Sequence, residues 1–173
     1  GIAIQQFDFE PNPADYLLFF GRIHPDKGTK EAIDIARACN KKLLIAGLIQ
    51  DKEYYQQDVV PQLENGKAEY LGNVGPTERS KLLGKASAML HPINFNEPFG
   101  LSIIEAMACG TPVIAYNRGS MPELIEHGKN GFLVNSLDEA ITAVSGIEKI
   151  DRSYCRHHVE KYFTADRMVE EYI

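Results

Sequence analysis

The chain has 173 residues, of which 44% are hydrophobic and 24% charged, and its formal net charge is −6. This length predicts a single domain that buries about 70% of the surface its unfolded chain would expose. The acidic balance and the lack of a Lys/Arg run exclude a nucleic-acid surface, and no apolar run approaches the roughly 20 residues of a membrane span. Three distant cysteines, Cys39, Cys109 and Cys155, have no metal-ligand spacing and predict reduced thiols.

Short apolar runs alternate with helical periodicity along most of the chain. Residues 1–15 have no sustained period and are interpreted as an interdomain linker or strap. Strands are predicted at residues 16–20, 43–46, 68–71, 88–91, 112–116 and 131–134. Helices are predicted at residues 29–39, 51–63, 76–86, 121–125 and 137–144, with a further short apolar helix after Gly100. This alternation predicts an α/β fold, a doubly wound Rossmann-like parallel sheet of about six strands with helices on both faces, over residues 16–150.

Residues 151–173 are predicted to form two C-terminal helical pieces. The break falls near Phe163, and Thr164 is a suitable N-cap for the second piece.

Glu105 is the only charged residue of the short apolar helix, so its carboxylate needs partners if it is buried. Small neighbours one turn away leave room for a ligand hydroxyl beside it. The alternative is a purely structural pairing with a buried arginine or with backbone amides. The sequence leaves both interpretations open.

Gly100 marks the start of that helix, where unpaired backbone N–H groups and the helix dipole favour an anion, above all a phosphate. Glu97 precedes Pro98, which places it in the loop at the same rim. Two carboxylates and an anion site are therefore expected at one edge of the sheet.

Ligands of doubly wound sheets bind beyond the carboxyl ends of the strands, where the connections diverge. Gly21, Arg22 and Lys27 follow the first strand, and the two cations suit a diphosphate, although a solvated loop would also carry such charges. The turn from Leu71 to Val74 follows the third strand. His91, at the end of the fourth, is expected to line the cleft without acting as a base, and His24 receives no role.

Four segments together resemble the nucleotide-sugar half of a GT-B fold glycosyltransferase, in particular glycosyltransferase family 4 (glycosyl transferases group 1). The segments are FFGRIHPDKG, YLGNV, EPFGLSIIEAMACGTPVIA with its Glu-x7-Glu pattern, and MPELIEHGKNGFLV. The opening GIAIQQF resembles the family's interdomain Asn-Gly-Ile-Asp linker, with Ala3 in place of the usual Asp, so the chain is expected to begin at a domain boundary. Ile93 and the Arg118-Gly119-Ser120 turn depart from the family pattern.

The resemblance implies a role for each matching residue. Arg22 and Lys27 would bind the donor diphosphate and stabilise charge on the leaving nucleotide, and Glu97 would contact the donor sugar; these three are the catalytic candidates. Glu105 would accept hydrogen bonds from ribose hydroxyls. The remaining donor-binding candidates supply backbone contacts: Gly21, Gly72, Asn73, Val74, Phe99, Gly100 and Leu101.

The implied reaction is transfer of a sugar from a UDP- or GDP-linked donor to an acceptor hydroxyl, with retention of anomeric configuration. No metal or other cofactor is expected, and the donor diphosphate would rely on the two cations and the helix start. The partners implied are a nucleotide sugar and an N-terminal acceptor domain absent from this chain, toward which residues 151–173 would pack. The fragment alone would bind donor without turnover, in a cytoplasmic protein whose only membrane contact would be peripheral and through the absent domain.

Two alternatives stay open at this point. One is a nucleotide-sugar epimerase with the same fold, and the other is a non-catalytic nucleotide-sugar-binding module. A dinucleotide-dependent dehydrogenase is disfavoured, because GRIHPDKG lacks the glycine fingerprint of such enzymes.

Overall fold

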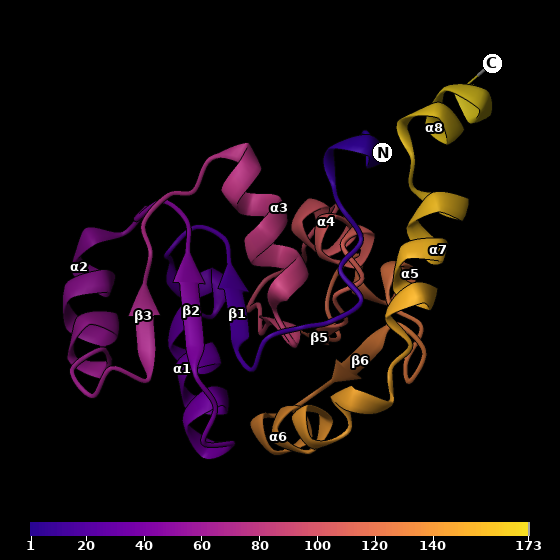
Figure 1. The fold of residues 1–173 in the computed structure, drawn as a ribbon. Helices are drawn as coiled ribbons and strands as arrows, with labels where there is room; N and C mark the ends of the chain where they lie inside the picture. Colours follow the sequence, from indigo (N-terminus) through magenta and orange to yellow (C-terminus); the bar gives the residue numbers. More distant parts are fainter. Residues whose placement is uncertain (173) are drawn as a thin grey trace.

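A six-stranded parallel sheet forms the centre of the computed structural model (Figure 1). The structure describes residues 1–172, so the last residue of the predicted C-terminal helical piece, Ile173, lies outside the described residues. The strands are β1 (Leu17–Phe20), β2 (Leu43–Ala46), β3 (Ala68–Tyr70), β4 (Ala88–His91), β5 (Val113–Tyr116) and β6 (Gly131–Val134).

The sheet order is β3-β2-β1-β4-β5-β6, and every neighbouring pair is parallel. Leu17 of β1 aligns with Leu43 of β2 on one side and with Ala88 of β4 on the other. From β1 the chain builds outward to β3 and then crosses back to β4, so the strand order reverses between β1 and β4. The predicted doubly wound sheet is thereby confirmed, and its ligand crevice is expected at that reversal.

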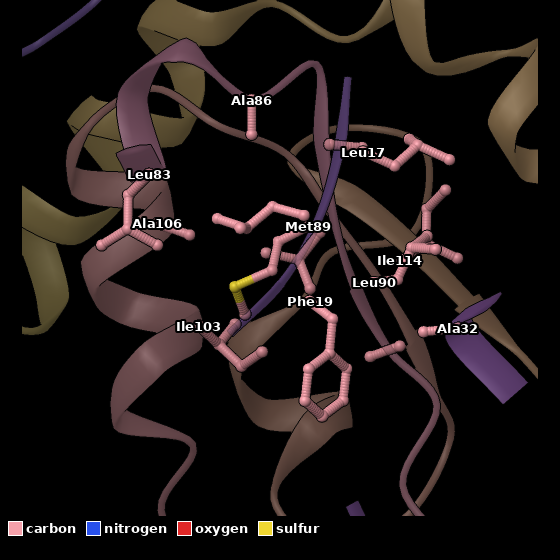
Figure 2. Packing of buried hydrophobic residues seen from close by; sticks show 14 of the residues in the cluster. Leu17, Phe19, Ala32, Leu83, Ala86, Met89, Leu90, Ile103, Ala106 and Ile114 are labelled. Carbon is pink, nitrogen blue, oxygen red and sulfur yellow. The ribbon is translucent and has the colours of Figure 1, made fainter. Parts of the chain in front are cut away.

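Helices cover the sheet on both faces. They are α1 (Thr29–Ala38), α2 (Lys52–Tyr54), α3 (Pro76–Lys85), α4 (Leu101–Ala108), α5 (Met121–Leu124), α6 (Leu137–Ser145), α7 (Arg152–Tyr162) and α8 (Ala165–Tyr172). Helix α1 packs beside α6, whereas α4 packs between α3 and α7. Figure 2 shows the core between the sheet and the helices α3 and α4, where Phe19 and Met89 of the central strands lie near Ile103 of α4. Burial of such side chains is the main favourable contribution to folding.

The segment predicted as one polar helix at residues 51–63 is helical throughout but not regular. Asp51 caps α2 by accepting a hydrogen bond from the backbone N–H of Tyr54 at 2.9 Å. A π-helical turn follows at Tyr55–Val59 and a 3-10 turn at Val60–Gln62. Pro61 lies in that last turn and has no N–H to donate, so an α-helical hydrogen-bond ladder cannot continue through it. Further 3-10 turns occur at Ile4–Gln6, Pro25–Lys27 and Ile147–Lys149.

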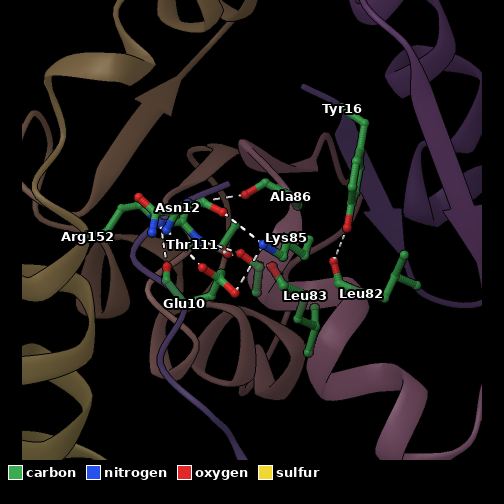
Figure 3. Close-up of polar contacts among 10 residues, drawn as sticks. Glu10, Asn12, Tyr16, Leu82, Leu83, Lys85, Ala86, Thr111 and Arg152 are labelled. Carbon is green, nitrogen blue, oxygen red and sulfur yellow. Dashed lines mark hydrogen bonds and ion pairs between the residues drawn. The ribbon is translucent and has the colours of Figure 1, made fainter. Parts of the chain in front are cut away.

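Helix α7 ties the N-terminal segment to the domain (Figure 3). The guanidinium of Arg152 donates to the carbonyl of Glu10 at 2.9 Å, to that of Ala86 at 3.1 Å and to the hydroxyl of Thr111 at 3.1 Å. Arg156, one turn later, donates to the last carbonyl of α4, that of Ala108, at 2.9 Å. Charged donors of this kind satisfy the carbonyls that a helix end leaves unpaired.

The N-terminal segment pairs with the chain where it enters α8. The N–H of Ile2 donates to the carbonyl of Phe163 at 2.9 Å, and the N–H of Ala165 donates to the carbonyl of Ile2 at 3.0 Å. The hydroxyl of Thr164 accepts from the N–H of Arg167 at 3.3 Å, so the predicted break and cap are confirmed. Among the described residues, no helix has both the length and the apolar character needed to cross a bilayer.

Candidate functional site

The loops after β1 and β4 are in direct contact at the point where the strand order reverses. The N–H of Asn94 donates to the carbonyl of Asp26 at 2.8 Å. Gly28 has a φ of +78°, and a Cβ at this position would come within 1.9 Å of the carbonyl oxygen of Pro92. Glycine is therefore required here both for its dihedral angle and for the close approach of the two loops.

Lys27 and Glu97, from those two loops, form an ion pair. Lys27 Nζ lies 3.0 Å from Glu97 Oε2, and the two side chains are only 17% and 14% exposed. The same ammonium lies 4.8 Å from the centre of the Phe95 ring, a distance at which a cation is attracted to the aromatic face. The structure thus brings two of the predicted catalytic residues together and pairs them with each other.

The position of Glu97 is fixed from the next loop along the sheet. The N–H of Ser120 donates to the carbonyl of Glu97 at 2.8 Å. A Cβ on Gly119, whose φ is +57°, would lie 2.4 Å from the backbone N and O of Glu97. The Arg118-Gly119-Ser120 turn therefore packs against the backbone of the Glu97 loop and holds it in place.

His91 is the last residue of β4, and its imidazole lies next to this ion pair. Its side chain is 6% exposed, and its Nε2 is buried without a hydrogen-bond partner among the described residues, 3.9 Å from Glu97 Oε2. Burial lowers the pKa of His91 to about 4, against the opposing effect of Glu97, and Lys27 lowers it further. His91 is therefore a neutral imidazole at pH 7.

Glu105 lies on α4 with its carboxylate paired to Arg79 of α3. Nη1 of Arg79 is 3.2 Å from both carboxylate oxygens, and the side chain of Glu105 is 8% exposed while that of Arg79 is 33% exposed. Burial raises the pKa of Glu105 in spite of the nearby guanidinium. Arg79 also lies 6.0 Å from the ring of Phe20, the last residue of β1, which places the pair at the carboxyl end of the sheet.

The start of α4 leaves backbone donors free. Within residues 1–172, the N–H groups of Phe99, Gly100, Leu101 and Ser102 have no acceptor. Gly100 has a φ of +71°, and a Cβ there would meet side chains of α5, Leu124 and Met121, at 2.7 Å. Its missing side chain is thus explained by packing as well as by the helix start. Phe99 is 78% exposed and Leu101 is 52% exposed at the rim of the site.

The remaining predicted residues line the same edge of the sheet on the far side of β1. Gly47, which ends β2, donates its N–H to the carbonyl of Gly72 at 2.9 Å, and a Cβ on it would lie 1.8 Å from the carbonyl oxygen of Gly21. Arg22 is exposed, and its side chain makes no hydrogen bond or ion pair with the described residues. Asn73 is exposed and Val74 is half-buried.

Two contributors to this site, Arg79 and Gly47, were not predicted from the sequence, whereas His91, which was expected to line the cleft, lies next to Glu97. Arg79 is one of several charged residues on a polar helix, and nothing in the local pattern distinguishes it. Gly47 did mark a strand end, but its contact with two other loops depends on tertiary structure. Across the described residues, no three His, Cys, Asp or Glu side chains gather in an arrangement that could hold a metal ion.

Comparison with known proteins gives a consistent family assignment. Residues 3–161 match the family model described as glycosyl transferases group 1. The chain is 29% identical over 169 residues to a probable sucrose-phosphate synthase of Thermosipho melanesiensis, covering 91% of this chain and 40% of that protein. It is 37% identical over 123 residues to an uncharacterized glycosyltransferase of Methanocaldococcus jannaschii, covering 68% of this chain and 31% of that protein. The chain thus spans less than half the length of these curated relatives.

Solved structures share the fold over nearly the whole chain. AviGT4, a glycosyltransferase involved in avilamycin A biosynthesis, superposes with a TM-score of 0.81 at 26% identity, over 99% of this chain and 55% of that protein. Anabaena Alr3699/HepE in complex with UDP superposes with a TM-score of 0.85 at 23% identity, over 99% of this chain and 54% of that protein. At that identity, the second likeness establishes the fold alone.

Proposed function

Because the chain belongs to the glycosyl transferases group 1 family, we propose that it is the donor-binding domain of a retaining glycosyltransferase of family 4. The donor would be a UDP- or GDP-linked sugar, and the acceptor a hydroxyl group. The observation that carries the proposal is the pairing of Lys27 with Glu97 at the strand-order reversal, beside a helix start with free backbone donors. Ligands of doubly wound sheets bind at this place.

Each polar group in the site suits one part of a nucleotide sugar. Arg22 and Lys27 carry the positive charge that a diphosphate needs, both in the bound donor and as negative charge grows on the leaving nucleotide. The free N–H groups at the start of α4 add hydrogen bonds to phosphate or sugar oxygens. Glu97 accepts hydrogen bonds from the donor sugar, and Glu105, oriented by Arg79, accepts them from the ribose.

The loops after β1, β2 and β3 form the other side of the site. Gly21 and Gly72 both lie against Gly47, so the turn carrying Asn73 and Val74 is held next to the loop carrying Arg22. Main-chain groups of this turn would frame the nucleotide base. Recognition through the main chain fits the presence of glycine, because a side chain would keep the ligand away from the backbone.

The chain is proposed to bind donor without turning it over. The acceptor site and part of the catalytic machinery would lie in an N-terminal domain, which fits the 40% share of the Thermosipho relative that this chain covers. Residues 151–173 would pack toward that domain. We further propose that no divalent metal takes part and that the protein is cytoplasmic.

Calorimetric titration of the chain with UDP, GDP, ADP and their glucose conjugates tests the proposal. We expect one nucleoside diphosphate and its sugar conjugate to bind, and binding to persist in EDTA. The Lys27→Ala and Glu105→Ala double variant should bind at least about a hundredfold more weakly, since each lost charged contact contributes about 1.5–3 kcal/mol. Lys41→Ala is the matched control, because Lys41 pairs with Asp15 on the surface, outside the site.

Three results would contradict parts of the proposal. Failure of every nucleotide and nucleotide sugar to bind would overturn the donor-binding function, and unchanged binding by the double variant would overturn the site. Sugar release or transfer by the chain alone would overturn the proposed division of labour between two domains.

A further inference from the structure

Glu97 and Lys27 cannot both keep their present partner when a donor is bound. In the structure Lys27 Nζ bonds Glu97 Oε2 at 3.0 Å. Under the proposed function, which this inference deepens, the ammonium turns to the donor diphosphate and the carboxylate turns to the sugar. The Glu97 side chain is only 14% exposed, and a carboxylate has more acceptor sites than sugar hydroxyls on one side of it can fill, so a donor from the protein is needed to replace Lys27.

One candidate donor is already in place. His91 Nε2 lies 3.9 Å from Glu97 Oε2, which is too far for a hydrogen bond in the present state. This nitrogen is buried and has no partner among the described residues, an arrangement that costs free energy in the present state and that a partner in another state would explain. Once the ion pair with Lys27 is broken, a shift of about 1 Å by the Glu97 carboxylate brings Oε2 within hydrogen-bond distance of His91 Nε2.

We infer that His91 is a positioning residue for Glu97. When the donor diphosphate draws Lys27 away, the His91 Nε2–H donates a hydrogen bond to the Glu97 carboxylate. This bond holds the carboxylate toward the donor sugar. His91 reaches the sugar only through Glu97. The exchange requires a proton on Nε2. Because burial at the end of β4 keeps the ring neutral at pH 7, His91 must hold its single ring proton on that nitrogen.

The surroundings of His91 allow this exchange without a rearrangement of the backbone. The loop that carries Glu97 is anchored by Ser120 and Gly119, so only the side chain has to move. Lys27 stays over the Phe95 ring and can turn its ammonium from the carboxylate to a phosphate.

In the complex with a free nucleoside diphosphate, water in the empty sugar subsite can also solvate Glu97. A bound sugar excludes that water, so the dependence on His91 should be strongest for the sugar-linked donor.

Calorimetry on His91 variants tests the inference. The probes are UDP and UDP-glucose, or the GDP or ADP pair if the wild-type chain selects that base. In His91→Phe, we expect the affinity for the sugar conjugate to fall about tenfold or more, the effect of one hydrogen bond to a charged group, while affinity for the free diphosphate changes less than about threefold. His91→Gln should retain the sugar affinity to within about threefold, because its amide can donate a hydrogen bond near the position of Nε2.

A matched control comes from the other buried histidine with an unpartnered Nε2. His158 lies on α7, where its Nδ1 is 3.2 Å from Glu126. His158→Phe places the same ring in a comparably buried position and should leave both affinities unchanged. Circular dichroism and urea unfolding confirm that each variant is folded before titration.

A direct readout does not depend on affinity. In 15N-labelled protein, addition of the sugar conjugate should bring out a slowly exchanging His91 Nε2–H resonance, and the free diphosphate should bring it out more weakly.

The possible outcomes separate the inference from the proposed function. Suppose that the wild-type chain binds the conjugate and that His91→Phe keeps the wild-type ratio of affinities for the conjugate and the free diphosphate. The inference is then overturned, while donor binding stands. An equal loss of sugar affinity in His91→Gln and His91→Phe would make His91 a packing residue and overturn it as well. If the wild-type chain binds neither probe, or binds the conjugate no more tightly than the free diphosphate, the sugar role of Glu97 fails and the inference fails with it.

Discussion

Removal of Arg79 isolates the energetic role of the buried Glu105 carboxylate. In Arg79→Met the apolar stem is kept, but both hydrogen bonds to Glu105 at 3.2 Å are lost. The Glu105 side chain, which is 8% exposed, then keeps its charge without this partner. Breaking a buried ion pair costs about 3–5 kcal/mol. Because Arg79 is one-third exposed and the contacts are longer than the best charge-assisted ones, we expect a loss nearer about 2 kcal/mol in the free energy of unfolding at pH 7.5.

The pH dependence of this loss distinguishes it from lost packing. The pKa of Glu105 is raised in the folded protein, so the folded state binds a proton more tightly than the unfolded state. Its contribution to stability therefore declines as pH rises from the unfolded pKa through the folded one. Without Arg79 the folded pKa rises further and the decline is larger. The deficit of Arg79→Met should thus shrink as pH falls toward about 4, the usual range of a Glu side chain, because protonation progressively removes the charge in both proteins.

Urea unfolding of wild type and Arg79→Met at pH 7.5 and pH 4.5 measures both effects, and groups that titrate alike in the two proteins cancel in the difference. Arg37→Met is the control, because Arg37 is half exposed and its contact with Asp34 is a surface pair worth at most about 0.5 kcal/mol. The double variant Arg79→Met with Glu105→Gln should recover much of the loss. A deficit that is equal at both pH values, or no recovery in the double variant, would refute the assignment of the loss to an unpaired carboxylate.

Three further predictions concern stability and are checked by urea unfolding. Gly28→Ala should cost at least about 2 kcal/mol, because φ is +78° and the new Cβ would lie 1.9 Å from the carbonyl oxygen of Pro92, whereas Gly66→Ala, at φ +74° with open space around it, should cost only about 1 kcal/mol; equal losses would contradict the packing argument. Arg152→Met should cost about 3 kcal/mol and Arg152→Lys nearly as much, since an ammonium cannot reach the separate carbonyls that the guanidinium bridges, and full rescue by lysine would contradict this account. Because the folded pKa of His91, about 4, lies below its unfolded value, wild-type stability should fall as pH drops from 6.5 to 4, and His91→Gln should remove up to about 3 kcal/mol of that fall; an unchanged pH slope would count against a buried neutral imidazole.

The architecture followed from the sequence because its signals are local. Runs such as Leu17–Phe20 and Val113–Tyr116 are short, apolar and bounded by turn residues, and their alternation with helices leaves few arrangements other than a doubly wound sheet. The irregular helix at residues 52–62 was harder to predict. The prediction of one polar helix over residues 51–63 took no account of Pro61, and whether a chain breaks at such a proline or continues with altered hydrogen bonds depends on what packs against it.

The sequence predicted which loops carry the candidate residues, but it did not predict which side chains pair with each other. Glu97, Gly100 and Glu105 lie within one stretch of chain, so their spacing placed them at the start of one helix. The partners of the two glutamates come from elsewhere: Lys27 follows β1, and Arg79 lies on the helix before β4. For Glu105, the sequence left a ligand hydroxyl and a structural arginine as alternatives, and the structure shows the arginine. These two interpretations are compatible, since one guanidinium nitrogen does not saturate the acceptor sites of a carboxylate.

The pairing of Lys27 with Glu97 also bears on the kind of ligand that the site favours. A free diphosphate must take Lys27 away from Glu97 and then lie near that carboxylate, and two like charges about 5 Å apart repel by about 3 kcal/mol at an effective dielectric constant of about 20. A sugar attached to the diphosphate places neutral hydroxyl groups, which are hydrogen-bond donors, against the carboxylate. Under the proposed function, the carboxylate that penalises the free diphosphate would favour the sugar-linked donor. The ion pair of Lys27 with Glu97 would then support selection of a sugar-linked donor over the nucleoside diphosphate that remains after transfer.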